Sequence, residues 1–178
     1  YQGIDWISST AIDLNPQHAS VVKADWFDFA HDLCSADSAK PFDAIIMSLV
    51  LNFQGDPRCR GDMLALAADT RVLRNGGLLF VALPVASLDN SRYCSEGKLI
   101  EIAEALGLSC IDSPRRSMKL VFIVFRALPQ RHNAYDTRTR SFKFQRHVKR
   151  ELVRKGTKKL NNFCIMLTDT RERCLHGV

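Results

Sequence analysis

Two apolar runs constrain the fold of this chain more than any other feature of its sequence. Residues 42–52 read FDAIIMSLVLN, and residues 76–84 read GGLLFVALP. Continuous apolar runs of this length are typical of central parallel strands that are covered on both faces. Between them lies a helical apolar face made of Met63, Leu64, Leu66, Ala67 and Leu73. Strand, helix and strand at this spacing predict a parallel α/β sheet with right-handed crossovers.

Shorter segments extend this pattern along the chain. We expect strands at residues 10–15, 20–25, 119–128 and 161–167, and a helix on Leu99, Ile102, Ala103 and Leu106 that is closed by Gly107. The expected organisation is a core at residues 1–130, a basic segment at 131–160, and a final strand with a tail at 161–178.

The positive charge of the chain lies in its C-terminal part. Residues 1–130 carry 12 Lys and Arg against 15 Asp and Glu, whereas residues 131–178 carry 13 against 4. This division of the net charge of +6 indicates a polyanionic partner such as nucleic acid, or else a solvated basic tail.

The composition also bears on cellular context. No stretch approaches the roughly 20 apolar residues that span a bilayer, and the N-terminal residues do not form a signal peptide, so we expect a soluble intracellular protein. The six cysteines lack the spacing of zinc ligands or of a disulfide framework, which favours buried or idle thiols.

The residues that end the predicted strands are the candidate site, because ligands of open parallel sheets bind outside the carboxyl ends of the strands. Asp13 and Asp25 each end a short strand. A carboxylate there can accept both hydroxyls of a ribose, or Asp25 can contact an adenine edge beside Trp26. Each acid can equally be a helix N-cap, Asp13 before Pro16 and Asp25 before the helix that starts at Trp26.

An Asn-Phe pair follows the apolar run at residues 52 and 53. The Asn52 amide can pair with the edge of a base, and the Phe53 ring offers a stacking face for an extruded purine. An Asn at a strand end is also an ordinary turn residue.

Four segments carry a resemblance to a known family: AIDLNPQH with ADWFDF, SLVLNFQGDPRCRGDML, LLFVALPVASLDNSRY and SMKLVFIVF. In this order they resemble the fungal family that methylates adenine N1 in large-subunit (25S) ribosomal RNA, whose metazoan relatives include an S-adenosylmethionine sensor. The resemblance implies a Rossmann-like fold that depends on S-adenosylmethionine (AdoMet), with a parallel sheet and an antiparallel final strand. It also implies a nucleolar protein that acts on precursor ribosomal RNA during ribosome biogenesis, which we expect to be a monomer.

The resemblance assigns the cofactor residues and places Ser48 to Asn52 along the methyl-transfer site, and we infer the contacts with the target base and the RNA from that placement and from the charge pattern. Asp13 corresponds to the acid that binds the cofactor ribose, Asp25 with Trp26 lies near its adenine, and Ser48 and Leu49 form the adjacent wall. Asn52 and Phe53 would hold the target base while its N1 attacks the methyl group. The expected RNA contacts are Arg58, Arg60, Arg92 and Tyr93 at the rim, and Lys149, Arg150, Arg154 and Lys155 in the basic segment.

One expected part of the fold is missing from the sequence. Such a methyltransferase needs a first strand and a glycine-rich turn ahead of Asp13, and only YQGIDWISST precedes that strand. We therefore expect a chain that is incomplete at its N-terminus. A non-catalytic AdoMet sensor and an inactive fragment remain alternatives to the enzyme.

Overall fold

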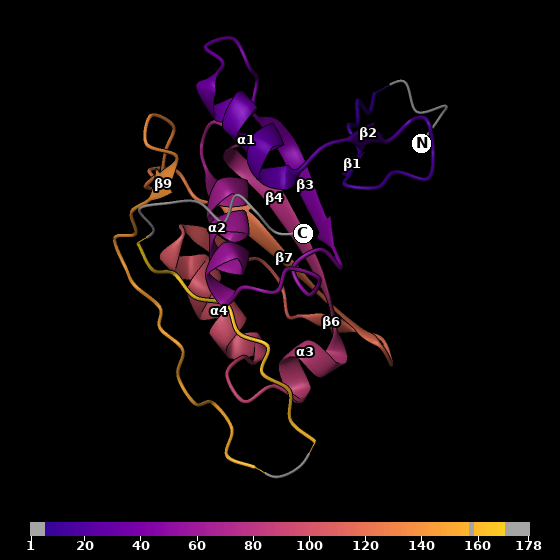
Figure 1. Ribbon diagram of the computed structural model, residues 1–178, viewed down its shortest axis with the longest axis vertical. Coiled ribbons are helices and arrows are strands. Elements are labelled where there is room, and N and C mark those ends of the chain that lie inside the picture. The colour runs from indigo at the N-terminus through magenta and orange to yellow at the C-terminus, as the bar shows by residue number, and fades with distance from the viewer. Residues whose placement is uncertain (1–5, 157–158, 170–178) are drawn as a thin grey trace.

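Figure 1 shows the computed structural model, which describes residues 6–156 and 159–169. The strands are β1 (Ile12–Asp13), β2 (Val22–Lys23), β3 (Phe42–Ser48), β4 (Leu73–Pro84), β5 (Leu108–Cys110), β6 (Arg115–Arg116), β7 (Leu120–Ala127), β8 (Tyr135–Asp136) and β9 (Ser141–Phe142). The helices are α1 (Trp26–Ser35), α2 (Pro57–Ala68), α3 (Val85–Asp89) and α4 (Glu96–Ala105).

The main sheet is mixed, with the strand order β3-β4-β7-β5 and with β6 paired to β7. Strands β3 and β4 are parallel, as their apolar runs predicted, and α2 connects them. Strand β7 is antiparallel to β4, β5 and β6. The α/β class is therefore confirmed, but the strand expected at residues 161–167 is wrong, because this segment makes only isolated bridges at Asn161 and Leu167.

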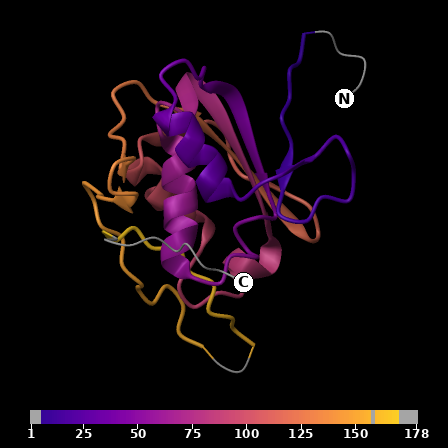
Figure 2. The same ribbon diagram turned by 45° about the horizontal axis from the view of Figure 1, so that its top comes forward.

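In residues 6–156 and 159–169 the sheet is covered on one face only, which corrects the expectation of two covered faces. Side chains alternate along β7, with Val121, Ile123 and Phe125 buried and Phe122 exposed by 41%. Figures 1 and 2 show helices α1 and α2 together on one side of the sheet. Of the described helices none covers the opposite face, where Ile46 is 71% exposed.

The first two strands form a sheet of their own. Strands β1 and β2 are parallel and pair through Ile12 with Val22 and Asp13 with Lys23. In Figure 1 they lie apart from the helical layer. The expectation of one sheet that includes these strands is wrong for the described residues, since no strand among them pairs with the other edge of β3.

The helix boundaries follow local chemistry. Asp25 caps α1 by accepting the N–H groups of Phe27 and Asp28, and Asp56 caps α2 just before Pro57. Helix α4 ends before Gly107, whose φ of 75° suits glycine, as expected. Helix α2 ends earlier than expected, at Ala68, so that Leu73 belongs to β4 instead.

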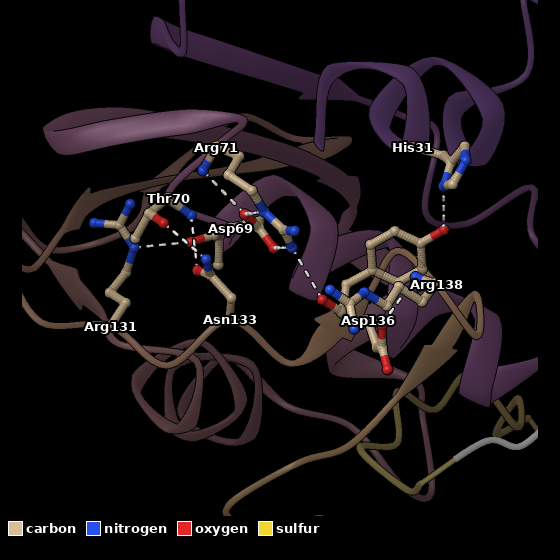
Figure 3. Close-up of polar contacts among 10 residues, drawn as sticks. His31, Asp69, Thr70, Arg71, Arg131, Asn133, Asp136 and Arg138 are labelled. Carbon is tan, nitrogen blue, oxygen red and sulfur yellow. Dashed lines mark hydrogen bonds and ion pairs between the residues drawn. The ribbon is translucent and has the colours of Figure 1, made fainter. Parts of the chain in front are cut away.

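The start of the basic segment is anchored to the end of α2 by a polar network (Figure 3). The buried Arg131 guanidinium donates to the carbonyl oxygens of Ala68, Leu73 and Leu128 at 2.8, 2.5 and 2.6 Å. Asn133 accepts the N–H of Thr70 at 2.9 Å. The basic segment therefore packs on the domain from its first residues.

Two aromatic side chains confirm that the basic segment packs on the core. Phe142 and Phe144 are buried, and their rings stack with centroids 6.1 Å apart. Both rings belong to the hydrophobic core, and Phe142 is the last residue of β9.

The cysteines divide into two groups. Cys34, Cys94, Cys110 and Cys164 are free thiols, as expected, and burial raises the pKa of Cys94 to about 12. Cys59 is disulfide-bonded, which the cysteine spacing did not predict. Cys174 lies outside the described residues.

No helix in the described part of the chain is long and apolar enough to cross a bilayer.

Candidate active site

The loop that follows β3 forms the centre of the candidate site, and we call residues 48–54 the site loop. Ser48 is exposed at the carboxyl end of β3, where it pairs with Ala82 of β4. Leu49 donates its N–H to Ala82 O and has a positive φ of 61°, a conformation that an L-residue adopts only under local constraint. A tight turn then follows, closed by the N–H of Phe53, which donates to Val50 O at 3.2 Å.

The turn presents two contrasting side chains. Phe53 is 83% exposed, which is unusual for a ring of this size. The neighbouring Asn52 is partly buried, and its Oδ1 atom is buried without a hydrogen-bond partner among the described residues. The exposed ring offers a stacking face to a planar ligand, whereas Asn52 Oδ1 has almost no accessible surface and would meet a ligand only after the side chain turned.

The buried Arg60 side chain supports the site loop from the interior of the protein. It is only 8% exposed, and its Nε donates to Leu51 O at 3.1 Å and to Gln54 O at 2.7 Å. The expectation that Arg60 meets RNA phosphates at the rim is wrong, because its guanidinium points into the protein. Burial is also the main cause that lowers the pKa of Arg60 from its ordinary value.

Arg92 lies in the loop between α3 and α4 and contacts residues 159–167, which we call the closing segment. Its Nη1 donates to Leu160 O at 2.8 Å and to the Asn162 side chain at 3.0 Å. The neighbouring Ser91 hydroxyl donates to Phe163 O at 2.5 Å. The NSRY sequence therefore anchors the closing segment. The predicted contact of Arg92 with RNA stays a prediction.

Tyr93 and two arginines of the basic segment form a second anchor. The Arg150 guanidinium lies 3.9 Å from the centre of the Tyr93 ring. Arg154 donates to Leu88 O at 2.8 Å and to Ser91 O at 3.1 Å, both near the end of α3. These three side chains thus bind other parts of the domain. The prediction that they contact RNA did not anticipate these contacts.

Besides Arg150, which is exposed but stacks on Tyr93, three of the predicted RNA contacts lie on the surface. Arg58, at the start of α2, is exposed, and so are Lys149 and Lys155 of the basic segment. These cations are free to meet phosphates.

Of the predicted cofactor residues, Asp13 ends β1, Asp25 caps α1 and Trp26 begins this helix, whereas Ser48 and Leu49 lie at the end of β3. Asp13 is exposed, and its Oδ1 accepts the N–H of Asn15 at 2.7 Å, so it is a turn residue and not a helix cap. Ala24 donates its N–H to Asp13 O, which brings Asp13 close to Asp25. Asp25 uses Oδ1 for both capping bonds, and its Oδ2 can accept a further one.

Trp26 has a packing contact. It is partly buried, and its indole N–H donates to Met63 O of α2 at 3.2 Å. The contact joins α1 to α2 next to the two acids. Trp26 is therefore part of the helical layer, and its predicted role beside a cofactor stays a prediction.

Comparison with known proteins places the chain in a family. The family model described as 25S rRNA (adenine(2142)-N(1))-methyltransferase, Bmt2, matches residues 2–165. The chain belongs to this family. In this chain, SLVLNF and RGDML supply the site loop with its Arg60 support, and NSRY supplies the anchor of the closing segment.

Two individual proteins are also similar. The 25S rRNA (adenine(2142)-N(1))-methyltransferase of Saccharomyces cerevisiae (strain ATCC 204508 / S288c) is 32% identical over 129 residues, which are 71% of this chain and 36% of that protein. The chain thus spans about a third of the length of this curated relative. The solved structure of N-methyltransferase NodS from Bradyrhizobium japonicum WM9, in complex with S-adenosyl-L-homocysteine, has a TM-score of 0.46 and 15% identity, covering 68% of this chain and 66% of that one.

Sequence reasoning missed the contribution of the closing segment to the site. The Arg60 guanidinium donates to Cys164 O at 2.7 Å and lies 4.4 Å from the centre of the Phe163 ring. These contacts join positions that are more than 100 residues apart. The apolar character of residues 163–167 was the one available signal, and it predicted a strand instead.

Proposed function

We propose that the protein is an AdoMet-dependent methyltransferase that modifies adenine N1 in large-subunit ribosomal RNA. Membership of the family supports the reaction. One feature of the structure supports assigning the reaction to particular residues. This feature is the site loop, where the exposed ring of Phe53 lies beside Asn52, whose Oδ1 has no hydrogen-bond partner among the described residues. We further propose that it works as a monomer in the nucleolus during ribosome biogenesis.

The chain offers groups that fit the cofactor. Asp13 has an exposed carboxylate that can accept both hydroxyls of a ribose, and Asp25 keeps Oδ2 for the adenine. Ser48 and Leu49 close the site from the end of β3. When bound, AdoMet supplies a methyl group on a sulfonium sulfur.

The site residues have a positioning task in this reaction. The N1 atom of adenine carries an in-plane lone pair, so bond formation to the methyl carbon with loss of the sulfur bond needs no strong base. Asn52 holds the edge of the base and Phe53 stacks on its face, which aligns N1 and excludes water. Exposed cations, among them Arg58, Lys149 and Lys155, neutralise phosphates of the RNA.

Methyl transfer is tested with labelled AdoMet and large-subunit ribosomal RNA that lacks the modification. We expect the label in N1-methyladenosine after digestion of the RNA to nucleosides. Replacing Asp13 with Ala should weaken AdoMet binding by about 1.5 to 3 kcal/mol, the cost of losing charge-assisted hydrogen bonds. Calorimetry measures this loss.

The matched control is Asp37→Ala, because Asp37 is an exposed acid in the turn after α1, away from the strand ends. It should leave binding unchanged. Label in another nucleotide, or none, would contradict the proposal. AdoMet binding without transfer to any RNA would favour the sensor.

A further inference from the structure

Arg60 differs from the other arginines near the site in the direction of its side chain. It lies in the second turn of α2, and its Nε donates to the carbonyl oxygens of Leu51 and Gln54. These two carbonyls flank Asn52 and Phe53. One side chain therefore fixes both ends of the turn that presents the amide and the ring.

The same guanidinium bridges to the closing segment. Its Nη1 donates to Cys164 O at 2.7 Å, and its Cζ lies 4.4 Å from the centre of the Phe163 ring. Phe163 O in turn accepts the Ser91 hydroxyl at 2.5 Å. Arg60 thus connects the site loop, the closing segment and the NSRY loop through continuous contacts.

The geometry requires an arginine at this position. A guanidinium presents five donors in a fixed plane and can serve carbonyl groups in different directions while its flat face meets a ring. The ammonium group of a lysine is more strongly hydrated and cannot reproduce this set. Charge-assisted bonds of this kind are about twice as strong as neutral ones, which offsets the cost of burying the cation.

The site loop also needs such support. Leu49 has a positive φ, and Asn52 Oδ1 is buried without a described partner. Both features raise the free energy of the loop and persist only where surrounding contacts over-determine the conformation. Arg60 provides those contacts.

We propose that Arg60 is a positioning residue that holds the site loop in the conformation presenting Asn52 and Phe53, and that couples this loop to the closing segment. The inference rests on the proposed function for the role of Asn52 and Phe53. The contacts of Arg60 themselves do not depend on it.

The test compares Arg60→Lys with Arg131→Lys. Arg131 is a matched control because it is also 8% exposed and also donates to three carbonyl oxygens, one of them at the last residue of α2. Both substitutions should lower the melting temperature. Activity is then measured well below both melting temperatures.

We expect Arg60→Lys to lower kcat by about 10-fold to 100-fold, as small misplacements of reacting groups do, with little change in KM for AdoMet. We expect Arg131→Lys to retain kcat. Hydrogen exchange should be faster in peptides covering residues 48–56 and 160–165 of Arg60→Lys, and unchanged there in Arg131→Lys.

Three results would overturn the inference: unchanged exchange in the site loop, equal kcat for the two variants, or altered exchange without loss of kcat. If the unmodified protein transfers no methyl group, the proposed function fails. Hydrogen exchange then decides alone whether Arg60 holds the loop.

Discussion

At the scale of single residues, burial determines what each ionisable side chain does. Arg60 and Arg131 are buried cations that bond to carbonyl oxygens. Arg58 lies only two residues before Arg60 in α2, yet its side chain is exposed to solvent. Asp62 is the acidic counterpart. It is 2% exposed, its Oδ1 has no partner among the described residues, and burial raises its pKa to about 8.

Asp62 should make the protein less stable as pH rises. The unfolded carboxyl releases its proton near pH 3.8, while the folded one keeps it up to about pH 8. Between these values the folded state binds the extra proton, so raising the pH favours unfolding by up to about 1.4 kcal/mol per pH unit. Asp62→Asn should remove this slope from denaturant titrations, because the amide cannot ionise.

Asp37→Asn serves as the control for this titration, since Asp37 is an exposed acid. It should keep the pH dependence of the unmodified protein. A slope that survives in Asp62→Asn would show that other groups cause it.

At the scale of elements, the basic segment has two kinds of cation. Arg154 bonds to carbonyl groups near the end of α3, and Arg150 stacks on Tyr93, so both hold the segment to the domain. Lys149 and Lys155 are exposed beside them. Reversing all four charges together would therefore mix weaker RNA binding with weaker packing.

The double variant Lys149→Glu with Lys155→Glu should weaken RNA binding and leave the melting temperature unchanged. The dependence of log affinity on log salt should become shallower by about 0.7 to 0.9 for each phosphate that the protein no longer neutralises. Fluorescence anisotropy over a salt series measures both effects.

Arg154→Ala is the comparison variant, and it should lower the melting temperature by leaving Leu88 O and Ser91 O unpaired. If the double lysine variant binds RNA with the same affinity and salt slope as the unmodified protein, the basic segment is not an RNA-docking element.

At the scale of the whole molecule, the bare face of the sheet is the largest departure from an ordinary α/β domain. A shallow groove of about 190 Å³ lies on it, lined by apolar side chains that include Ile46, Phe80 and Phe122. Their exposed fractions are 71%, 36% and 41%. Contiguous apolar surface of this kind is uncommon on isolated soluble domains.

This face should bind an apolar fluorescent dye. Ile46→Thr with Phe122→Thr should lower the dye signal, because threonine keeps the strand propensity and removes most of the apolar area. The control is Leu152→Thr, since Leu152 is 54% exposed in the basic segment and outside the groove. A signal that falls equally with the control would mean that the dye binds elsewhere.

Local patterns in the sequence were enough to predict the local parts of this structure. Continuous apolar runs predicted β3, β4 and β7, the apolar face and Gly107 predicted α4, and Asp25 could be recognised as a possible cap. The position of Asn52 and Phe53 after β3 followed in the same way. These features depend on neighbours within a few residues, and their signal is therefore present in a short stretch of sequence.

The residues that meet across the chain could be known only from the folded protein. Pattern reasoning placed Arg60 at the rim and residues 161–167 in a strand, yet Arg60 points inward because Leu51, Gln54 and Cys164 offer carbonyl oxygens there. Likewise the apolar runs did not indicate that one face of the sheet stays open, since a strand's composition does not reveal whether a helix packs above it. Side-chain direction and coverage depend on distant partners, and no local pattern records them.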